Sequence, residues 1–204
     1  MSKIKICGLS RLQDIDAVNE ALPDYIGFVF APSPRQVGTM QASALKKTLD
    51  RRIQAVGVFV DADIDKVAAL ALDGVIDMIQ LHGHEDALYI RKLKRAVSVP
   101  VIKAVRVKRA EQIMEAQPLD CDYLLLDTWQ KGVQGGSGLT FDWSLIPRDI
   151  KPYFLAGGLN AQNILRAAQL KPYCLDVSSG AETDGIKDKD KIIKLVQQIR
   201  RQNN

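Results

Sequence analysis

Short apolar runs alternate with helix-like segments along this chain, and that alternation constrains the fold more than any other feature. Each run is rich in Val, Ile, Leu and Phe, and each is followed by a polar or glycine-containing turn and then a helical pattern. We expect eight strands, at residues 3–7, 25–30, 55–60, 78–81, 101–105, 123–126, 153–156 and 174–177. Because helical crossovers join parallel strands and eight such units close a barrel, the sequence predicts an α/β fold with a closed parallel eight-stranded sheet, a single (β/α)8 TIM barrel.

Three polar residues mark where helices are expected to begin. Ser10, Asp63 and Asn160 each precede an amphipathic segment, and all three are residue types that cap helix N-termini. The turn at residues 7–10 lacks the Gly-x-Gly-x-x-Gly fingerprint, and the chain contains no Walker pattern. These absences disfavour the competing fold, an open doubly wound nucleotide-binding sheet.

Length and composition indicate one folded domain. A chain of 204 residues is long enough for one such barrel, so we expect a single domain over residues 1–204. The hydrophobic share of 47% supplies a core, and the net charge of +4, without a basic stripe or stacking aromatics, predicts no nucleic-acid partner. We expect the charged stretch that contains Lys187 and Lys189 to be a solvated helix face.

The location of the protein and the state of its thiols follow from two further patterns. No apolar stretch approaches membrane-spanning length, and the first residues show no secretory pattern, so we expect a cytoplasmic protein with no membrane partner. Cys7, Cys121 and Cys174 lack the paired spacing of a disulfide framework or a zinc site. They are expected to be reduced thiols.

Two reactive side chains stand at the ends of expected strands, where an α/β barrel places its chemistry. Cys7 ends the first strand, although a free cysteine is also a common buried residue, so a structural role is the alternative. Asp127 follows the sixth strand, where a carboxylate serves either as a helix N-cap or as a proton donor. The glycine-rich loop at 129–138 suits a mobile lid and favours catalysis by Asp127.

The turns after the last two strands predict a phosphate site. Gly157 and Gly158 leave room for backbone N–H groups to approach a ligand, and Ser178, Ser179 and Gly180 add hydroxyl donors before a short segment at 181–185. In this fold, the loops after strands seven and eight and the start of a small extra helix form a recurrent phosphate site. Tight turns without a ligand are the alternative role for these glycines.

Two more polar residues are candidates for substrate contact. Arg35 lies in a proline-stiffened turn after the second strand and could hold a carboxylate bidentately, whereas a solvated surface arginine is the commoner case. His82 and His84 lie two residues apart without a clear third ligand. We therefore predict no metal site and expect His82 to line the pocket.

Several motifs together give the chain a specific resemblance to a known family. They lie at residues 3–8, 27–30 with 33–35, 80–83, 126–128, 135–138 with 141–143, 157–159 and 176–180. Each is weak alone, but in their joint order and spacing they resemble the phosphoribosylanthranilate isomerases of tryptophan biosynthesis. The resemblance runs nearly end to end.

The resemblance implies an enzyme, its reaction and the roles of its residues. The reaction is the Amadori rearrangement of N-(5-phospho-β-D-ribosyl)anthranilate to 1-(2-carboxyphenylamino)-1-deoxy-D-ribulose 5-phosphate. Cys7 is expected as general base, Asp127 as general acid and Arg35 as the group that faces the anthranilate carboxylate, while the glycine and serine turns hold the phosphate. The only implied partner is the small phosphorylated substrate, without a cofactor, and the chain is expected to be a monomer or a homodimer.

Strand alternation suggests how Cys7 could ionise. Lys5 and Cys7 project to the same side of the first strand, and Asp176 lies on the eighth strand, which closes against the first. We expect Lys5 to point into the barrel, pair with Asp176 and favour the Cys7 thiolate. A lysine packed beneath the site with no effect on Cys7 is the alternative.

The sequence departs from the family pattern at two positions, and two other functions compete. Leu139 stands where relatives often carry a lysine, and Ala181 where valine is frequent. One competing function is a phosphosugar isomerase of the histidine-pathway type, which is expected to carry an aspartate in place of Cys7. The other is a non-catalytic barrel that binds a phosphorylated ligand, against which Cys7 and Asp127 argue.

Overall fold

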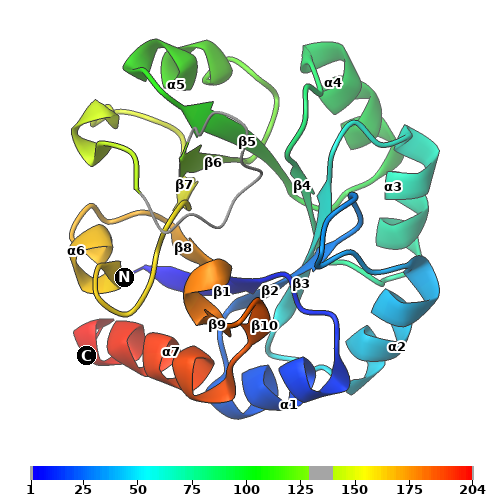
Figure 1. Ribbon diagram of the computed structural model, residues 1–204. Coiled ribbons are helices and arrows are strands. Elements are labelled where there is room, and N and C mark those ends of the chain that lie inside the picture. The colour runs from blue at the N-terminus through cyan, green and yellow to red at the C-terminus, as the bar shows by residue number, and fades with distance from the viewer. Residues whose placement is uncertain (1, 129–139, 204) are drawn as a thin grey trace.

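A closed barrel of eight parallel strands forms the centre of the protein (Figure 1). The computed structural model describes residues 2–128 and 140–203. The strands pair in chain order, and β8 closes the barrel against β1. They are β1 Lys3–Cys7, β2 Tyr25–Val29, β3 Gln54–Phe59, β4 Met78–Leu81, β5 Val101–Val107, β6 Tyr123–Thr128, β7 Tyr153–Leu155 and β8 Cys174–Val177. The predicted α/β barrel is confirmed, and each predicted strand end lies within two residues of the observed one.

Helices surround the barrel and cover the outer face of its sheet (Figure 1). They are α1 Leu12–Ala21, α2 Thr39–Thr48, α3 Ile64–Leu72, α4 Ala87–Ala96, α5 Ala110–Ala116, α6 Ile164–Ala168 and α7 Lys189–Asn203. In α7 the buried residues recur at helical spacing, at Ile192, Leu195, Val196 and Ile199, which lays one apolar stripe on the barrel. None of the described helices has the length and hydropathy needed to span a bilayer.

Only one of the three predicted helix caps is found. Asp63 is the N-cap of α3, where its side chain accepts a hydrogen bond from the N–H of Asp65. Ser10 is not a cap, because α1 begins one residue later with Arg11 as N-cap and the Asp14 carboxylate accepts the N–H of Ser10. Asn160 is not one either.

The position at which α6 begins explains why Asn160 is not its cap. This helix begins at Ile164 with Asn163 as its N-cap, later than predicted. The Asn160 side chain accepts a hydrogen bond from the N–H of Gln162 instead, so it stabilises the turn before the helix. A residue type that suits a cap suits such a turn equally well.

A compact plug of side chains fills the barrel interior and supports the polar groups above it. It consists of Tyr25, Val56, Met78, Ile102, Ala104, Leu125, Phe154, Ala156 and Cys174. Asp127 and Asp176 lie two residues beyond Leu125 and Cys174, and side chains two apart on a strand share a face. The plug therefore closes the barrel beneath Asp127 and Asp176.

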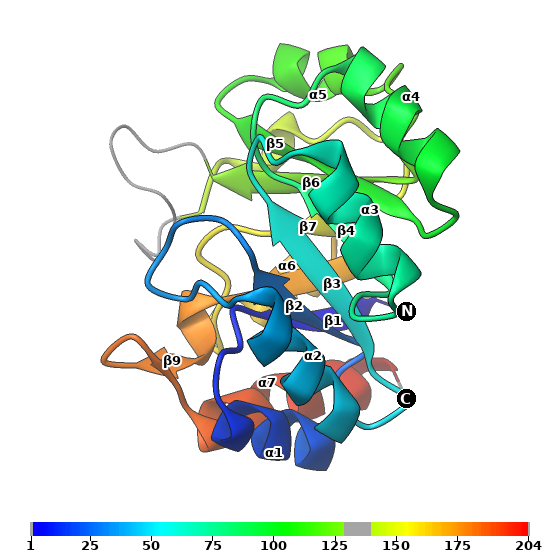
Figure 2. The ribbon, with the colours of Figure 1, turned by 90° about the vertical axis from the view of Figure 1, so that its right-hand side faces the viewer.

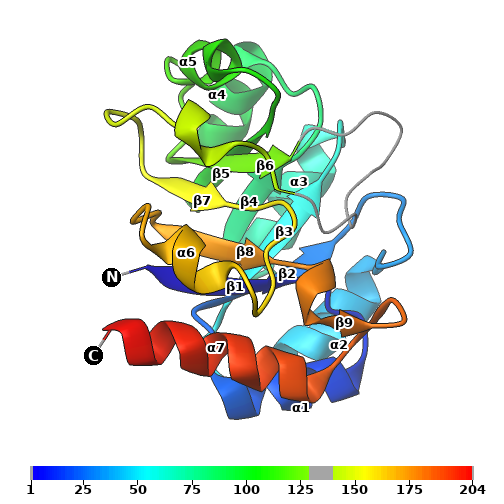
Figure 3. The same ribbon diagram turned by 60° about the vertical axis from the view of Figure 1, so that its left-hand side comes forward.

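The chain adds a small hairpin after β8. A single 3-10 turn, η2 Ser179–Ala181, leads into the strands β9 Glu182–Thr183 and β10 Ile186–Lys187, and a second 3-10 turn, η1 Trp143–Leu145, precedes β7. In the side views, β9 and the loop after β2 lie at one end of the barrel and both chain termini at the other (Figures 2 and 3). This end, where the parallel strands finish, carries the candidate site.

Candidate active site

One pocket at the carboxyl end of the strands collects most of the predicted site residues. Its volume is about 490 Å³, in the range of small-molecule sites. Of the predicted residues, it is lined by Cys7, Arg35, His82, Asp127, Gly157, Gly158, Asp176, Ser178 and Ser179. Gly180 follows Ser179 in the chain but does not line the pocket. The glycine-rich loop at 129–138 and Leu139 lie outside the described residues.

Cys7 is a buried thiol at the end of β1. Its side chain fits because β2 places Gly27 beside it in the ladder, where a Cβ atom would lie 2.5 Å from the Cys7 sulfur. Burial raises the pKa of Cys7 above its usual value, and the charge of Lys5 opposes that shift without overcoming it. The neutral thiol is therefore the favoured form at neutral pH. Cys7, Cys121 and Cys174 are all free, as predicted.

The predicted ion pair beneath Cys7 is present. Lys5 is fully buried, and its Nζ lies 2.8 Å from Oδ2 of Asp176. Burial lowers the pKa of Lys5 but the charge of Asp176 raises it, and the net shift is upward, so Lys5 is an ammonium ion. Lys5 lowers the pKa of Cys7, which is the predicted direction, although burial of Cys7 raises that pKa by more. The other carboxylate oxygen of Asp176 is buried and has no hydrogen-bond partner among the described residues.

Gln80 connects this ion pair to His82. Its Oε1 accepts a hydrogen bond from Lys5 Nζ at 2.8 Å, and its Nε2 lies 2.9 Å from Nδ1 of His82. Because an ammonium group only donates, Gln80 must present its amide N–H groups to His82. Nδ1 therefore accepts, and the neutral imidazole carries its proton on Nε2.

Asp127 lies beside the Nε2 edge of the His82 ring. Oδ2 of Asp127 lies 3.3 Å from Nε2 of His82, and Oδ1 accepts the backbone N–H of Thr128 at 2.8 Å. Asp127 is not a helix cap, since it lies within β6, but it is partly open to the pocket. A chain of polar contacts thus runs from Asp176 through Lys5, Gln80 and His82 to Asp127.

The two glycines after β7 occupy a turn that other residues would disrupt. Gly157 and Gly158 have φ values of 84° and 66°, in the left-handed region. A Cβ atom on Gly157 would lie 2.2 Å from Oγ1 of Thr128. A Cβ atom on Gly180 would lie 1.9 Å from the carbonyl oxygen of Leu159, so the turns after β7 and β8 pack directly on each other. These contacts place two backbone turns side by side at the pocket wall.

The segment after the serines differs from the prediction. Ser178 donates a hydrogen bond from Oγ to the carbonyl of Cys7 at 3.3 Å, and Ser179 opens the three-residue turn η2. The short segment expected at 181–185 is largely a hairpin, because Glu182 and Thr183 pair with Lys187 and Ile186. The expected extra helix is thus limited to one 3-10 turn.

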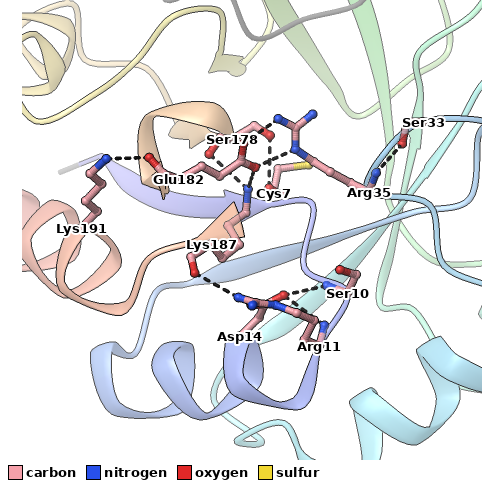
Figure 4. Close-up of polar contacts among 10 residues, drawn as sticks. All are labelled: Cys7, Ser10, Arg11, Asp14, Ser33, Arg35, Ser178, Glu182, Lys187 and Lys191. Carbon is pink, nitrogen blue, oxygen red and sulfur yellow. Dashed lines mark hydrogen bonds and ion pairs between the residues drawn. The ribbon is translucent and has the colours of Figure 1, made fainter. Parts of the chain in front are cut away.

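Arg35 lines the pocket, but its guanidinium already contacts a carboxylate of the protein (Figure 4). Nε lies 2.6 Å from Oε1 of Glu182, and Nη2 lies 2.6 Å from Oε2 of the same carboxylate. These hydrogen bonds hold the pKa of Arg35 above its usual value. Arg35 is therefore not the solvated surface arginine of the alternative prediction.

Sequence reasoning missed several polar residues at the site. Arg106 lines the pocket at an inward position of β5, and the two-residue alternation of that strand could have identified it. Lys187 was expected on a solvated helix face, but it is buried on β10 and pairs with Glu182. No periodic signal marks Lys187 or Glu182, because they pair across a two-stranded hairpin and Glu182 also pairs with Arg35, 147 positions away.

His84 lies apart from His82 and outside the pocket. Its ring is exposed, and Nδ1 lies 3.1 Å from Oδ2 of Asp61. Across residues 2–128 and 140–203, no group of three or more His, Cys, Asp and Glu side chains is arranged to hold a metal ion.

Comparison with known proteins gives one consistent result. The family model for N-(5'phosphoribosyl)anthranilate (PRA) isomerase matches residues 4–198. An N-(5'-phosphoribosyl)anthranilate isomerase of Endomicrobium trichonymphae is 49% identical over 201 residues, which cover 98% of this chain and 99% of that protein.

Two solved structures show the same fold over nearly the full length. A crystal structure of phosphoribosyl anthranilate isomerase in complex with reduced 1-(o-carboxyphenylamino)-1-deoxyribulose 5-phosphate has a TM-score of 0.86 and 34% identity, and the match covers 98% of this chain and 100% of that one. Monomers generated from the dimeric enzyme of Thermotoga maritima give a TM-score of 0.85 at 34% identity, with the same two coverages.

Proposed function

This chain belongs to the N-(5'-phosphoribosyl)anthranilate isomerase family, and from that membership we propose which of its residues perform the reaction. The chain is an isomerase of tryptophan biosynthesis and catalyses the Amadori rearrangement of N-(5-phospho-β-D-ribosyl)anthranilate. The proposal for its residues rests on one observation: Cys7 and Asp127, from strands on different sides of the barrel, line the same pocket.

Asp127 is the proposed general acid for opening the ribose ring. A protonated Asp127 donates its proton to the ring oxygen as the bond between that oxygen and C1′ breaks, and the nitrogen lone pair forms the C1′=N bond. The N–H of Thr128 and the Nε2–H of His82 then stabilise the carboxylate that remains. Both donors are in place before the reaction, so they need not reorganise during it.

Cys7 is the proposed general base for the second step. Its thiolate removes the proton from C2′ of the ring-opened iminium. The electron pair of that C–H bond forms the C1′=C2′ bond, and the pair of the C1′=N bond returns to nitrogen to give an enolamine. Tautomerisation of the enolamine then gives the ketone. Because burial raises the pKa of Cys7, only a small fraction is thiolate at neutral pH. Lys5 increases that fraction.

The phosphate is proposed to lie against the turns after β7 and β8. The left-handed turn at Gly157 and Gly158 allows backbone N–H groups to approach an anion, and the hydroxyls of Ser178 and Ser179 add donors. Asp176 lines the same wall of the pocket and is proposed to contribute to substrate binding there. Gly180 contributes by letting the two turns pack together.

The anthranilate is proposed to lie on the opposite side of the pocket. Val29, Ala31, Val58 and Val60 form an apolar wall from β2, β3 and the residues that follow them. Arg35 stands beside this wall, where its guanidinium would face the ring carboxylate. An aromatic acid thus finds apolar surface for its ring and a cation for its charge.

The test follows the loss of substrate fluorescence with wild-type protein and with Cys7→Ala and Asp127→Asn. Each variant is expected to keep its thermal unfolding midpoint while kcat/KM falls by about 10²–10⁴-fold, the usual contribution of one general acid or base. Cys121→Ala, which removes a buried thiol outside the pocket, is the matched control and is expected to retain activity. Near-normal turnover by a folded Cys7→Ala or Asp127→Asn protein would refute the role assigned to that residue.

We further propose that residues 1–204 act as one catalytic domain on this phosphorylated substrate. The dimeric state of the Thermotoga maritima relative supports a homodimer over a monomer. The family match disfavours the histidine-pathway isomerase and the non-catalytic barrel as alternatives.

A further inference from the structure

Glu182 is a buried carboxylate that none of the roles above requires. It lies on β9, its side chain is 5% exposed, and both of its oxygens face Arg35 (Figure 4). Burying a carboxylate is costly unless it is paired and hydrogen-bonded. The burial of Glu182 therefore depends on the charged groups that surround it.

Two cations keep Glu182 ionised. Lys187, directly across the hairpin on β10, donates to the same carboxylate that holds Arg35. Burial raises the pKa of Glu182, but the hydrogen bonds from Arg35 and Lys187 outweigh burial, so the pKa lies below its usual value. Glu182 is thus a carboxylate at neutral pH and accepts hydrogen bonds only.

The hairpin that carries Glu182 is tied to three other parts of the fold (Figure 4). Lys187 Nζ donates to the carbonyl of Ser178 at the end of β8, at 3.2 Å. Arg11, next to α1, donates to the carbonyl of Lys187 at 3.0 Å, and Lys191 of α7 donates to the carbonyl of Glu182 at 2.6 Å. These contacts fix the backbone on either side of the carboxylate.

The Arg35 side chain is also held along its stem. A Cβ atom on Gly8 would lie 2.5 Å from Cδ of Arg35, so the stem lies directly against the turn that follows Cys7. The guanidinium therefore has a packed stem on one side and the Glu182 carboxylate on another. It is thus held by contacts on two sides although it borders the pocket.

The number of donors on a guanidinium decides what remains available. It has five N–H groups, and Glu182 occupies one on Nε and one on Nη2. The edge formed by Nη1 and the second N–H of Nη2 is a separate fork, and a carboxylate fits such a fork with two parallel hydrogen bonds. Arg35 can bind Glu182 and a second carboxylate at the same time.

We propose that Glu182 is a positioning residue, which orients Arg35 so that its Nη1–Nη2 edge faces the carboxylate of the substrate. This inference rests on the proposed function, because it assumes that Arg35 binds the anthranilate carboxylate. Glu182 acts through Arg35 and touches no reacting atom. Its contribution is to fix the guanidinium before the substrate arrives, which lowers the entropy cost of binding.

The test compares two substrates, N-(5-phosphoribosyl)anthranilate and the aniline analogue that lacks the carboxylate. With Glu182→Gln, the side-chain amide brings N–H groups against the N–H groups of Arg35, so the guanidinium should turn away. For the anthranilate substrate, KM is expected to rise about 10-fold with little change in kcat, the loss expected for one charge-assisted hydrogen bond. For the aniline substrate, kcat/KM should stay within about 2-fold of the wild-type value, because this substrate has no carboxylate for Arg35 to bind.

Further variants establish that Glu182 acts through Arg35. Arg35→Met should likewise impair activity on the anthranilate substrate only. The double variant should be no worse than Arg35→Met alone, because both changes remove the same interaction, that of Arg35 with the substrate carboxylate. Glu182→Asp keeps the charge but is one methylene shorter, so it should give a smaller loss, again only with the anthranilate substrate. Glu20→Gln is the matched control, since Glu20 pairs with Lys189 on the exposed surface, and it should leave both substrates unaffected.

Specific results would overturn the inference. A folded Glu182→Gln or Glu182→Asp protein that loses activity equally on both substrates would show a general structural role, and one that loses none would show no role. Additive losses in the double variant would show that Glu182 acts independently of Arg35. Each of these results leaves the proposed function intact, whereas failure of the wild-type protein to isomerise the anthranilate substrate would refute both.

Discussion

Nε2 of His82 lies 3.3 Å from Oδ2 of Asp127, and the tautomer that places a proton on Nε2 is set from the far side of the barrel. Lys5 orients the Gln80 amide, and Gln80 in turn orients the imidazole. The proposed acid and the ion pair beneath the proposed base therefore belong to one connected polar network. Such networks hold their members in a single arrangement only while every member is satisfied.

Gln80→Met should disconnect His82 and Asp127 from the ion pair of Lys5 and Asp176. The change keeps the side-chain length but removes the donor to His82, so Nδ1 can carry the proton and Nε2 no longer donates to Asp127. We expect kcat to fall by about 10-fold, the value of one charge-assisted hydrogen bond, with little change in KM. Nitrogen NMR shifts of the His82 ring should show a change of tautomer. Unchanged shifts and unchanged kcat would contradict this account of Gln80.

The reactivity of Cys7 toward an alkylating agent should rise with pH throughout the neutral and mildly alkaline range. The pKa of Cys7 lies above its usual value because of burial, so the thiolate fraction is small at pH 7 and increases about tenfold per pH unit until that pKa is reached. We therefore expect the rate of Cys7 alkylation in the folded protein to increase from pH 7 to pH 9 without a plateau. A plateau below pH 8 would show that the thiol is more acidic than its surroundings predict.

Lys5→Met should move that profile to higher pH. Lys5 lowers the pKa of Cys7, so its removal leaves burial unopposed by this cation and raises the pKa further. The measurement is the pH dependence of Cys7 alkylation in the folded variant and in the wild-type protein. Identical profiles would support the alternative in which Lys5 only packs beneath the site.

Gly157→Ala should damage phosphate binding far more than a comparable change elsewhere. Gly157 has a φ of 84°, and an added Cβ would lie 2.2 Å from Oγ1 of Thr128. Gly74 has a φ of 68° but open space around its Cβ position, so Gly74→Ala carries the backbone strain alone, about 1 kcal/mol. We expect only Gly157→Ala to weaken inhibition by inorganic phosphate. Equal inhibition of both variants would argue against a phosphate site at this turn.

Glu182 should also make the stability of the protein sensitive to acid. Its folded-state pKa is lower than its usual value of 4.5, so its contribution is complete above pH 4.5 and is lost as the pH falls through the folded-state value. The difference in unfolding free energy between wild-type protein and Glu182→Gln should therefore shrink as the pH is lowered below 4.5. Urea denaturation at several pH values measures that difference, and a difference independent of pH would contradict the assignment.

The sequence predicted the barrel well, because parallel strands covered on both faces are apolar along their whole length. The errors lie at strand ends. Strands β5 and β6 each continue two residues further than predicted, since Arg106 pairs with Asp127 and Val107 with Thr128 in the ladder. Polar residues that face the pocket look like the start of a turn when only hydrophobicity is considered.

The site was predictable only in part. Cys7 and Asp127 stand where strand ends are expected, and two-residue alternation placed Lys5 beside Cys7. The pair formed by Arg35 and Glu182 joins residues 147 positions apart through a hairpin that gave no helical or strand pattern. Contacts of this kind depend on how loops meet above the barrel, which periodicity does not describe.

The fate of a deuterium atom at C2′ of the substrate tests most directly whether Cys7 removes that proton. Wild-type protein should convert the deuterated substrate more slowly than the protiated one and release the label to solvent, as NMR can follow. A folded Cys7→Ala protein should retain the label at C2′ and form almost no product. Release of the label by Cys7→Ala at the wild-type rate would show that another group is the base and would contradict the central claim.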